Sequence, residues 1–432
     1  MNNKQPIEIA AAFQILDQCC RNAANISRVE SILIEDAAGR CLANDLIAPF
    51  DHPPFDQSLR DGIAFSSENN AEPLQLAHVI HAGVMPQTKL APNQAVKVMT
   101  GAPLPEGADA VEMIENVRWS TNGKLLSLRY PTDWETTGQA THATVPPDSQ
   151  PGQFVLSRGS LFHTGQAILQ AGHRLTPQSI GLLASTGHTS IQVKGCPTVS
   201  LLTTGDEVIS ADSERQPGQI FNSNGPMLCS EIRSTNSTLI RKELIADQLQ
   251  ELRRFFQAAV EDTDLIVTTG GVSAGEKDYL PGLFQEFGFD TAFHGIRMKP
   301  GKPIWFGHRH QDGRNQFALG LPGNPVSCFV GFQLFGKRIL AHLNRIDPQA
   351  QYLRLPLEND FSVKGNRLTF WPGFFRTSTP WSDHPGSVRP LSWQGSPDLR
   401  TPAQANCLLV LDPTGPNGPD LLRGQEVWVL PC

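Results

Sequence analysis

The sequence predicts a multidomain α+β protein with a central α/β domain and β-rich regions on either side of it. Three observations support this fold class. The chain has 432 residues, enough for two to four domains of about 100–200 residues each. Its 37 glycines and 34 prolines show no repeat, which favours short strands and loops over long helices. A pattern of strand, loop and helix recurs from residue 196 onward, between two regions of short strand-like runs.

The chain before residue 196 contains three kinds of segment. Residues 6–22 place apolar side chains at helical spacing, which predicts an amphipathic helix. Residues 57–145 contain short alternating runs such as GIAF and LQLAHVI, which predict a mostly β region. The polar, proline-bearing stretch 132–152 predicts a long surface loop.

Four apolar runs follow between residues 196 and 345. They are PTVSLLTT, STLIRKELIA, DLIVTT and NQFALGL, and helical segments follow the second and the fourth. Because strands buried on both faces carry apolar side chains without alternation, these runs predict a parallel sheet covered by helices on both faces. The last segment, 350–432, consists of short strand-like runs with Gly/Pro turns and predicts a small β-barrel or sandwich.

Charge and cysteine content argue against several classes of protein. The 42 acidic and 35 basic residues give a net charge of −7, which disfavours a general nucleic-acid binder or a membrane-surface protein. No run reaches about 18 apolar residues, and acidic and polar residues interrupt the N-terminal apolar segment, so we expect neither a membrane span nor a signal peptide. The eight cysteines form no CxxC pair and fit a reducing cytosol, so we expect a cytoplasmic protein.

Candidate site residues follow the apolar strands. The turns at 204–207, 269–279 and 321–327 each come after a predicted strand, so we expect all three at the carboxyl edge of the sheet. Glycines in these turns let backbone N–H groups approach a phosphate, and the free amides of a following helix complement its charge. Asn324 is the expected N-cap of a helix that begins at Pro325. The sequence therefore predicts an anion-binding site.

Lysines and carboxylates occur near the same edge. Lys299 and Lys302 stand on a proline-stiffened turn and suit a phosphate or another oxyanion. The acids expected nearby are Asp206, Glu207 and Asp278, with Asp56 and Asp61 from the β region. Carboxylates beside an anion site indicate a divalent cation that bridges them to phosphate.

Six motifs occur in an order that resembles a known family. They are MTGAPLPEGADAV, TTGDEV, GQIFNSN, TTGGVSAGEKDY, MKPGKP and GLPGNPVS, and together they resemble the molybdopterin molybdenumtransferase family. The resemblance implies four domains: residues 1–49 with 146–195, an inserted β-rich domain at 50–145, an α/β molybdopterin-binding domain at 196–345 and a C-terminal β-barrel at 346–432. It also implies a homodimer whose active site lies between the α/β domain of one subunit and the inserted domain of the other.

Members of this family insert molybdate into adenylylated molybdopterin with release of AMP, and Mg²⁺ assists. The resemblance implies catalytic roles for Asp61, Thr100, Glu207 and Asp278, with Asp61 and Glu207 also as metal ligands. It implies substrate binding by Thr204, Gly205, Asp206, Asn224, Gly270, Gly271, Val272, Ser273, Gly275, Pro322, Gly323, Asn324 and Pro325. Lys299, Lys302 and Ser327 suit molybdate, a tetrahedral dianion. Asp247 also matches a functional position of the family, although we favour it as the cap of the following helix.

The chain departs from the family pattern at several motifs. Ser160 and Leu161 stand in place of two acids. Pro372 replaces an arginine that helps relatives to bind molybdate, and Arg400 is a candidate substitute for the lost charge.

Three functions therefore stay open. The first is the transferase, and the second is a molybdopterin- or cofactor-binding protein without insertase activity. The third is a molybdopterin adenylyltransferase, because the α/β segment alone resembles that related domain. The expected partners are a second copy of the chain, molybdopterin adenylyltransferase and molybdoenzyme maturation proteins, with no nucleic acid and no membrane.

Overall fold

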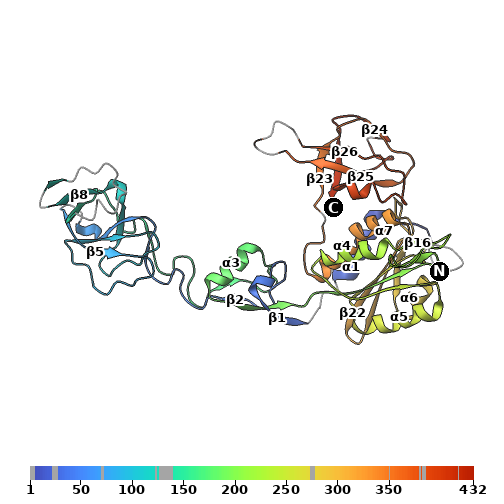
Figure 1. The fold of residues 1–432 in the computed structure, drawn as a ribbon, viewed down its shortest axis with the longest axis horizontal. Coiled ribbons are helices and arrows are strands. Elements are labelled where there is room, and N and C mark those ends of the chain that lie inside the picture. Colours follow the sequence, from blue (N-terminus) through green and yellow to red (C-terminus); the bar gives the residue numbers. More distant parts are fainter. Residues whose placement is uncertain are drawn as a thin grey trace. The chain divides into compact units, whose positions relative to one another are not determined.

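The computed structural model describes residues 5–21, 28–69, 73–121, 124–125, 140–272, 278–349, 351–378, 381, 386–416 and 418–432. The chain divides into two compact units (Figure 1). The first unit comprises residues 1–43, 174–176 and 191–432, and the second comprises residues 44–173 and 177–190. The four domain boundaries implied by the resemblance stay a prediction.

A six-stranded sheet forms the centre of the first unit. Its order is β17 (Thr238–Ile245), β14 (Thr198–Thr204), β18 (Leu265–Thr269), β22 (Arg314–Leu321), β21 (Trp305–Gln311) and β19 (Asp290–His294). The first four strands are parallel, as predicted. β21 and β19 are antiparallel to their neighbours, so the expectation of a purely parallel sheet is wrong at this edge. Asp312 and Gly313, both with positive φ, form the two-residue turn that reverses the chain between β21 and β22.

Helices cover both faces of this sheet, as the apolar runs predicted (Figure 1). On one face lie α1 (Ile9–Arg21), α4 (Asn224–Arg233), α7 (Pro325–Gly331) and α8 (Lys337–Leu343), with a π-helical turn at Phe332–Gly336 between the last two. On the other face lie α5 (Leu249–Asp262) and α6 (Leu280–Glu286). The helix predicted at 6–22 is therefore confirmed.

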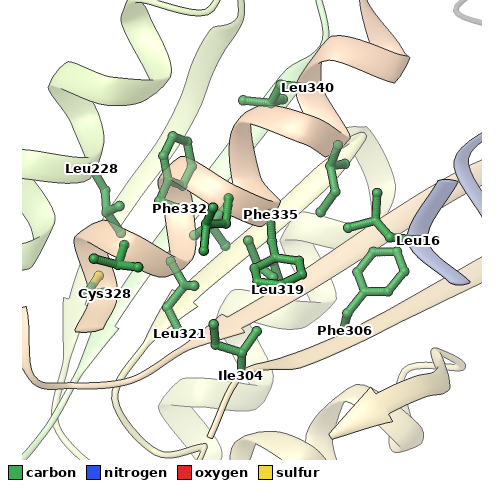
Figure 2. Close-up of a cluster of buried hydrophobic side chains, with 14 of the residues drawn as sticks. Leu16, Leu228, Ile304, Phe306, Leu319, Leu321, Cys328, Phe332, Phe335 and Leu340 are labelled. Atoms are coloured by element: carbon green, nitrogen blue, oxygen red, sulfur yellow. The ribbon is translucent and has the colours of Figure 1, made fainter. Parts of the chain in front are cut away.

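The two faces have separate apolar cores. In the first, Leu16 of α1 and Phe335 of the π-helical turn belong to the same buried cluster as Leu319 of β22 (Figure 2). In the second, the ring of Phe284 stacks on Trp305 with centroids 4.0 Å apart. Side chains on alternate positions of β14, β18 and β22 point into one core or the other, which explains why these runs are apolar throughout.

The C-terminal segment forms the small barrel that the sequence predicted. Its main path is β20 (Met298–Lys299), β25 (Leu368–Arg376), β27 (Cys407–Leu411), β29 (Glu426–Pro431) and β23 (Leu353–Pro356). β26 (Ser387–Pro390) pairs with β25, and its Val388 bridges Leu357 just after β23, which closes the ring. β24 (Phe361–Ser362) pairs with β28 (Asp420–Leu421), and a 3₁₀ turn spans Pro402–Gln404.

The second unit contains a seven-stranded sheet, in agreement with the β region expected there. Its order is β7 (Ala110–Met113), β4 (Gly62–Phe65), β6 (Gln94–Val98), β5 (Leu74–Ile80), β10 (His142–Thr144), β8 (Arg118–Thr121) and β9 (Lys124–Leu125). β10 lies within the stretch predicted as a long loop, so that prediction is wrong at 142–144. Residues 132–139 of the stretch lie outside the described residues. β10 belongs to the sheet because it pairs with both β5 and β8.

Smaller elements complete the chain. In the second unit, β2 (Leu46–Ile47) pairs with β12 (Ala167–Leu169), and β3 (Gln57–Ser58) pairs with β11 (Val155–Leu156). The same unit contains helix α3 (Pro177–Ser185). β1 (Val29–Leu33) pairs with β13 (Ser190–Lys194), and in the first unit β15 (Val208–Ile209) pairs with β16 (Ile220–Phe221). Short 3₁₀ turns occupy Ile34–Asp36, Ser67–Asn69 and Ile114–Asn116. Among the described residues, no helix has the length and apolarity to cross a membrane.

Candidate functional site

A cavity of about 820 Å³ opens at the carboxyl edge of the six-stranded sheet. The turns after β14, β18 and β22 line it, together with β16 and the first turn of α4. Most substrate-binding residues implied by the resemblance are on its walls: Thr204, Gly205, Asn224, Gly270, Gly271, Val272, Pro322, Gly323, Asn324 and Pro325. Two of the implied catalytic residues, Glu207 and Asp278, also line it. The three glycine turns therefore surround one site. Ser273 and Gly275 lie outside the described residues.

Other wall residues were not proposed from the sequence. They are Thr203, Val208, Ile220, Phe221, Asn222, Ser223, Pro303 and Pro397. Four of them belong to the motif GQIFNSN, in which only Asn224 was proposed as a site residue. The signal available in the sequence was two large apolar residues, Ile220 and Phe221, within a turn-rich polar stretch.

Glycine is required in the turn after β18 for two reasons. Gly270 has a φ of +92°, and a Cβ atom there would lie 2.3 Å from the carbonyl oxygen of Thr204. Gly271 has a φ of +60°, and its Cβ would lie 3.2 Å from the side chain of Leu280. Any side chain at residue 270 must therefore push the turn after β18 away from the turn after β14. This close approach sets the spacing of two walls of the cavity.

Asn224 connects three walls of the cavity through one buried amide group. Its Nδ2 donates to the Thr269 hydroxyl and to the Gly323 carbonyl oxygen, each at 2.8 Å. The Thr269 hydroxyl in turn donates to the carbonyl oxygen of Pro322 at 3.1 Å, so it accepts from Asn224. Both N–H bonds of the amide are used, and the orientation of the side chain is fixed. Asn224 thus braces the start of α4 against the turns after β18 and β22.

A second set of hydrogen bonds links the turn after β14 to the start of α5. The Thr204 hydroxyl donates to Asp247 Oδ1 at 2.6 Å, and the backbone N–H of Asp247 donates to Asp206 Oδ1 at 3.1 Å. The N-cap of α5 is Gln248, so the interpretation of Asp247 as a helix cap is wrong. Its carboxylate instead lines the cavity, whereas Asp206 is exposed and lies outside the lining.

Carboxylates dominate the charge of the cavity. Glu207, Asp247 and Asp278 line it, and none of its described lining residues is Lys, Arg or His. An anionic ligand in this cavity must therefore be bound by backbone N–H groups and the start of α4, or be accompanied by a cation.

The residues proposed for molybdate are close in sequence to residues of the cavity lining but are not part of the lining. Lys299 is half-buried in β20 and Lys302 is exposed on the same turn, one residue before the lining residue Pro303. Ser327 is buried in α7, two residues after the lining residue Pro325. Arg400 is exposed and follows the lining residue Pro397 by three positions. Pro372 is buried within β25 and lies outside the lining.

The cysteine that follows Ser327 in the chain is not a nucleophile. Cys328 of α7 is fully buried, and burial raises the pKa of its thiol to about 12. The thiol therefore stays protonated at neutral pH and packs in the core (Figure 2).

The chemistry of the wall carboxylates suits a hard divalent cation. The described residues contain no group of three or more His, Cys, Asp or Glu placed to enclose a metal ion. Mg²⁺ does not require such a group, since it keeps several waters and takes one or two carboxylates together with the phosphates of a substrate. The cavity fits a magnesium ion that arrives with a phosphate ligand.

Two further proposed residues lie together in the second unit. Asp61 Oδ1 accepts hydrogen bonds from the backbone N–H of Thr100 at 2.7 Å and from its hydroxyl at 3.0 Å. Both residues are exposed, and so are Ser160 and Leu161 of the same unit. The structure thus joins Asp61 to Thr100, and the pairing of Asp61 with Glu207 at one metal ion stays a prediction.

Comparison with known proteins identifies relatives that match almost the whole chain. A family model described as the MoeA N-terminal region (domain I and II) matches residues 7–187, and one described as a probable molybdopterin binding domain matches residues 200–342. A molybdopterin molybdenumtransferase of Bacillus subtilis is 31% identical over 428 residues, with 96% of this chain and 93% of the relative covered. One of Staphylococcus aureus is 28% identical over 427 residues, with 97% and 94% covered.

Solved structures agree with these matches. The molybdopterin biosynthesis moeA protein from Pyrococcus horikoshii OT3 is 25% identical and superposes with a TM-score of 0.78, covering 99% of this chain and 100% of that one. A second structure of the protein from the same genus is 27% identical, with a TM-score of 0.73 and 99% of each chain covered. Since the sequence match spans both units and the fold agrees along the full length, the chain belongs to the molybdopterin molybdenumtransferase family.

Proposed function

We propose that this protein transfers molybdenum from molybdate to adenylylated molybdopterin and releases AMP. The observation that carries this proposal is the single cavity around which the three glycine turns and the start of α4 meet. Family membership supplies the reaction, and the cavity supplies a place of suitable chemistry for a pterin ligand that carries phosphates.

The chain's own groups bind and orient the phosphates. Backbone N–H groups at Gly271 and Gly323 can approach phosphate oxygens closely because no side chain intervenes. The start of α4 adds the positive end of a helix dipole. The buried amide of Asn224 keeps these walls in place, so the site is formed before the ligand arrives.

Magnesium is part of the proposal. Glu207 and Asp278 would hold the ion on the first unit, and Asp61 is the candidate ligand on the second. A bound Mg²⁺ neutralises phosphate charge and polarises the phosphoanhydride. The carboxylates of this cavity would otherwise repel the phosphates, because its described walls carry no basic side chain. Lys299, Lys302, Ser327 and Arg400 are the candidate residues for molybdate, the second substrate.

The test is AMP release by the purified full chain. Adenylylated molybdopterin, molybdate and Mg²⁺ are mixed with the wild-type protein and with Glu207→Gln. We expect molybdate-dependent AMP release by the wild type and at least a hundredfold slower release by Glu207→Gln. This figure corresponds to about 3 kcal/mol of lost transition-state stabilisation. Absence of AMP release by the wild type under these conditions would reject the transferase.

A ligand-binding protein without turnover is the second candidate. Ser160 and Leu161 favour it because carboxylates of the family pattern are missing there. Calorimetric binding of adenylylated molybdopterin by the wild type, with no AMP released, would support this alternative. Consumption of ATP with free molybdopterin would instead indicate an adenylyltransferase.

We also propose a homodimer in which the second unit of one copy completes the cavity of the other. Family membership supports this proposal. Asp61 and Thr100 belong to one unit of the chain and Glu207 to the other. Mixing Asp61→Ala and Glu207→Gln chains should restore part of the activity, because one of the two mixed sites carries both wild-type acids. No restoration by mixed dimers would contradict the shared site.

The remaining proposals concern the setting of the reaction. We propose a cytoplasmic location, supported by eight cysteines that form no disulfide. Molybdopterin adenylyltransferase would supply the substrate, and molybdoenzyme maturation proteins would receive the product. Cell fractionation and co-purification with these partners test the two statements.

A further inference from the structure

The turn after β18 is tied to the edge strand β19 by the side chain of His294. His294 is the last residue of β19, and β22 and β21 lie between this strand and β18. Its Nε2 lies 2.9 Å from the carbonyl oxygen of Val272, a residue that lines the cavity. Because a carbonyl oxygen can only accept a hydrogen bond, Nε2 carries the proton and is the donor. The imidazole therefore holds one end of the glycine turn.

The side chain of Val272 is held as well as its carbonyl group. Val272 is 2% exposed and belongs to the buried cluster that contains Trp305. His294 pairs with Trp305, and Trp305 pairs with Gly320 of β22. A Cβ atom at Gly320 would lie 2.7 Å from Val272 Cγ1, so the valine packs directly over this glycine. Since residues paired across strands share a face of the sheet, His294 and Val272 lie on the same face.

The backbone just after His294 holds a second turn, which carries two lysines. The Ile296 N–H donates to the carbonyl oxygen of Lys302 at 2.9 Å. Lys302 and Lys299 of this lysine turn are candidate residues for molybdate. Residues 294–296 therefore contact the glycine turn through a side chain and the lysine turn through the backbone.

The hydrogen bond of His294 is the part of this connection that depends on a side chain. The bond from Ile296 uses backbone atoms and does not depend on which side chain is present. Loss of the imidazole donor would take this partner from the part-buried carbonyl oxygen of Val272, so the glycine turn could move relative to the lysine turn. Since a displacement of about 1 Å between reacting groups can slow a reaction strongly, such a movement would affect catalysis.

We propose that His294 is a positioning residue that sets the distance between the glycine turn after β18 and the lysine turn. The inference rests on the proposed function, in which the glycine turn binds phosphates of adenylylated molybdopterin and the lysine turn binds molybdate. His294 is not among the residues that line the cavity, so it acts through Val272 and not by contact with a substrate. Its role is to align the two substrates for the transfer.

The experiment compares two substitutions of His294 with a matched substitution elsewhere in the same sheet. His294→Phe keeps a ring and removes the donor, whereas His294→Gln keeps an amide N–H as a donor. His310→Phe is the control, because His310 Nδ1 lies 2.7 Å from Asn315 Oδ1 near the other end of β21 and His310 does not line the cavity. AMP release by the full chain is measured over a range of molybdate concentrations, with Mg²⁺ and saturating adenylylated molybdopterin. Urea unfolding gives the stability of each variant.

We expect His294→Phe to lower kcat for AMP release about tenfold and to raise the KM for molybdate about threefold or more. His294→Gln should come within about threefold of the wild-type kcat, because it keeps a donor. His310→Phe should stay within about twofold of the wild type in both constants, even if its stability falls as much as that of His294→Phe. A His294→Phe rate within twofold of the wild type, or a His294→Gln variant as slow as His294→Phe, would overturn the proposal.

A second measurement reports on the two turns without the reaction. Amide hydrogen exchange of the ligand-free full chain is compared at residues 270–272 and 298–302. Exchange in both turns should be about tenfold faster in His294→Phe than in the wild type, and His294→Gln should restore slow exchange. Unchanged exchange in either turn of His294→Phe would overturn the connection between them.

The two proposals fail in distinguishable ways. If the wild type releases no AMP but both turns exchange faster in His294→Phe, the connection through His294 stands and the transferase falls. If the wild type releases AMP and His294→Phe matches it in rate and in exchange, the transferase stands and the role of His294 falls.

Discussion

The two ends of the same parallel strands use their polar groups in different ways. At the amino end, Asp264 precedes β18, and its carboxylate accepts from the backbone N–H and the hydroxyl of Thr198 at 2.8 and 2.9 Å. Arg28 and Arg314 add ion pairs to it at 2.7 and 3.1 Å. At the carboxyl end, acids such as Glu207 line an open cavity with no basic side chain among its described walls.

The amino end of the sheet therefore contributes mainly to stability, and the carboxyl end mainly to ligand binding. At the amino end, a buried carboxylate surrounded by donors joins β14 and β18 and leaves no room for a ligand. At the carboxyl end, turns and helix starts present backbone groups to a space that a ligand can fill. Substitutions at the amino end should therefore change stability more than ligand binding, and those at the carboxyl end should do the reverse.

The largest effect is expected for Gly270→Ala. Its Cβ would lie 2.3 Å from the Thr204 carbonyl oxygen at a φ of +92°, so two cavity walls must move apart. We expect AMP release to fall at least a thousandfold, about 4 kcal/mol. Gly218→Ala is the control, since Gly218 also has a positive φ but would meet no atom within 4 Å. Equal rates for the two variants would contradict a role for the close approach.

A loss of stability without a loss of function is expected for Asp264→Ala. Removing this 7% exposed residue takes away the acceptor of the Thr198 N–H and the ion-pair partner of Arg28 and Arg314. We expect the free energy of unfolding in urea to fall by about 3 kcal/mol, with AMP release within threefold of the wild type. Glu251→Gln, which removes an exposed ion pair with Arg254, should change stability by less than about 0.5 kcal/mol.

Thr204→Val and Thr198→Val compare the two ends of β14 directly. Each replaces a hydroxyl that hydrogen-bonds a carboxylate, Asp247 for Thr204 and Asp264 for Thr198. Both should lower the free energy of unfolding by about 1 kcal/mol. Only Thr204→Val should slow AMP release, about tenfold, because Asp247 lines the cavity. A similar slowing by both variants would remove the distinction between the two edges.

The smallest effect concerns the acid stability of the amino edge. The hydrogen bond from Arg241 lowers the pKa of Asp262, and this outweighs burial, which raises it. A carboxyl whose pKa is lower in the folded state stabilises the protein above its unfolded pKa of about 4 and loses that contribution as the pH falls through the folded pKa. Asp262→Asn should therefore lose less stability than the wild type between about pH 5 and pH 2.

The expected difference between Asp262→Asn and the wild type is below about 1 kcal/mol, because solvent screens this half-exposed carboxylate. Urea unfolding at several pH values measures it. Parallel stability curves for the two proteins would show that the Arg241 pair does not contribute.

The strands and the glycine turns could be predicted from sequence because their signals are local. LQLAHVI coincides with β5, and the fully buried run at 198–204 coincides with β14. Strand order then placed three turns on one edge, where the cavity is found. The antiparallel strands β21 and β19 were missed because the Asp312–Gly313 turn, which joins β21 to β22, was not interpreted as a hairpin turn.

Other features of the site could not be predicted from the sequence because they depend on hydrogen bonds between residues that are distant in the chain. Asp247 has the spacing of a helix cap, yet a hydroxyl 43 positions away in the chain determines what its carboxylate does. The bracing role of Asn224 depends on Thr269 and Gly323, which are distant in sequence. Ile220 and Phe221 were not proposed as site residues because two exposed apolar residues become informative only when the cavity beside them is known.

Amide hydrogen exchange of the full chain, with and without adenylylated molybdopterin and Mg²⁺, tests the central claim most directly. The account predicts new protection in residues 204–208, 220–225, 269–271 and 322–326, and unchanged exchange at the amino ends of β14 and β18. Protection confined to the amino edge or to other parts of the chain, with the glycine turns unchanged, would contradict it.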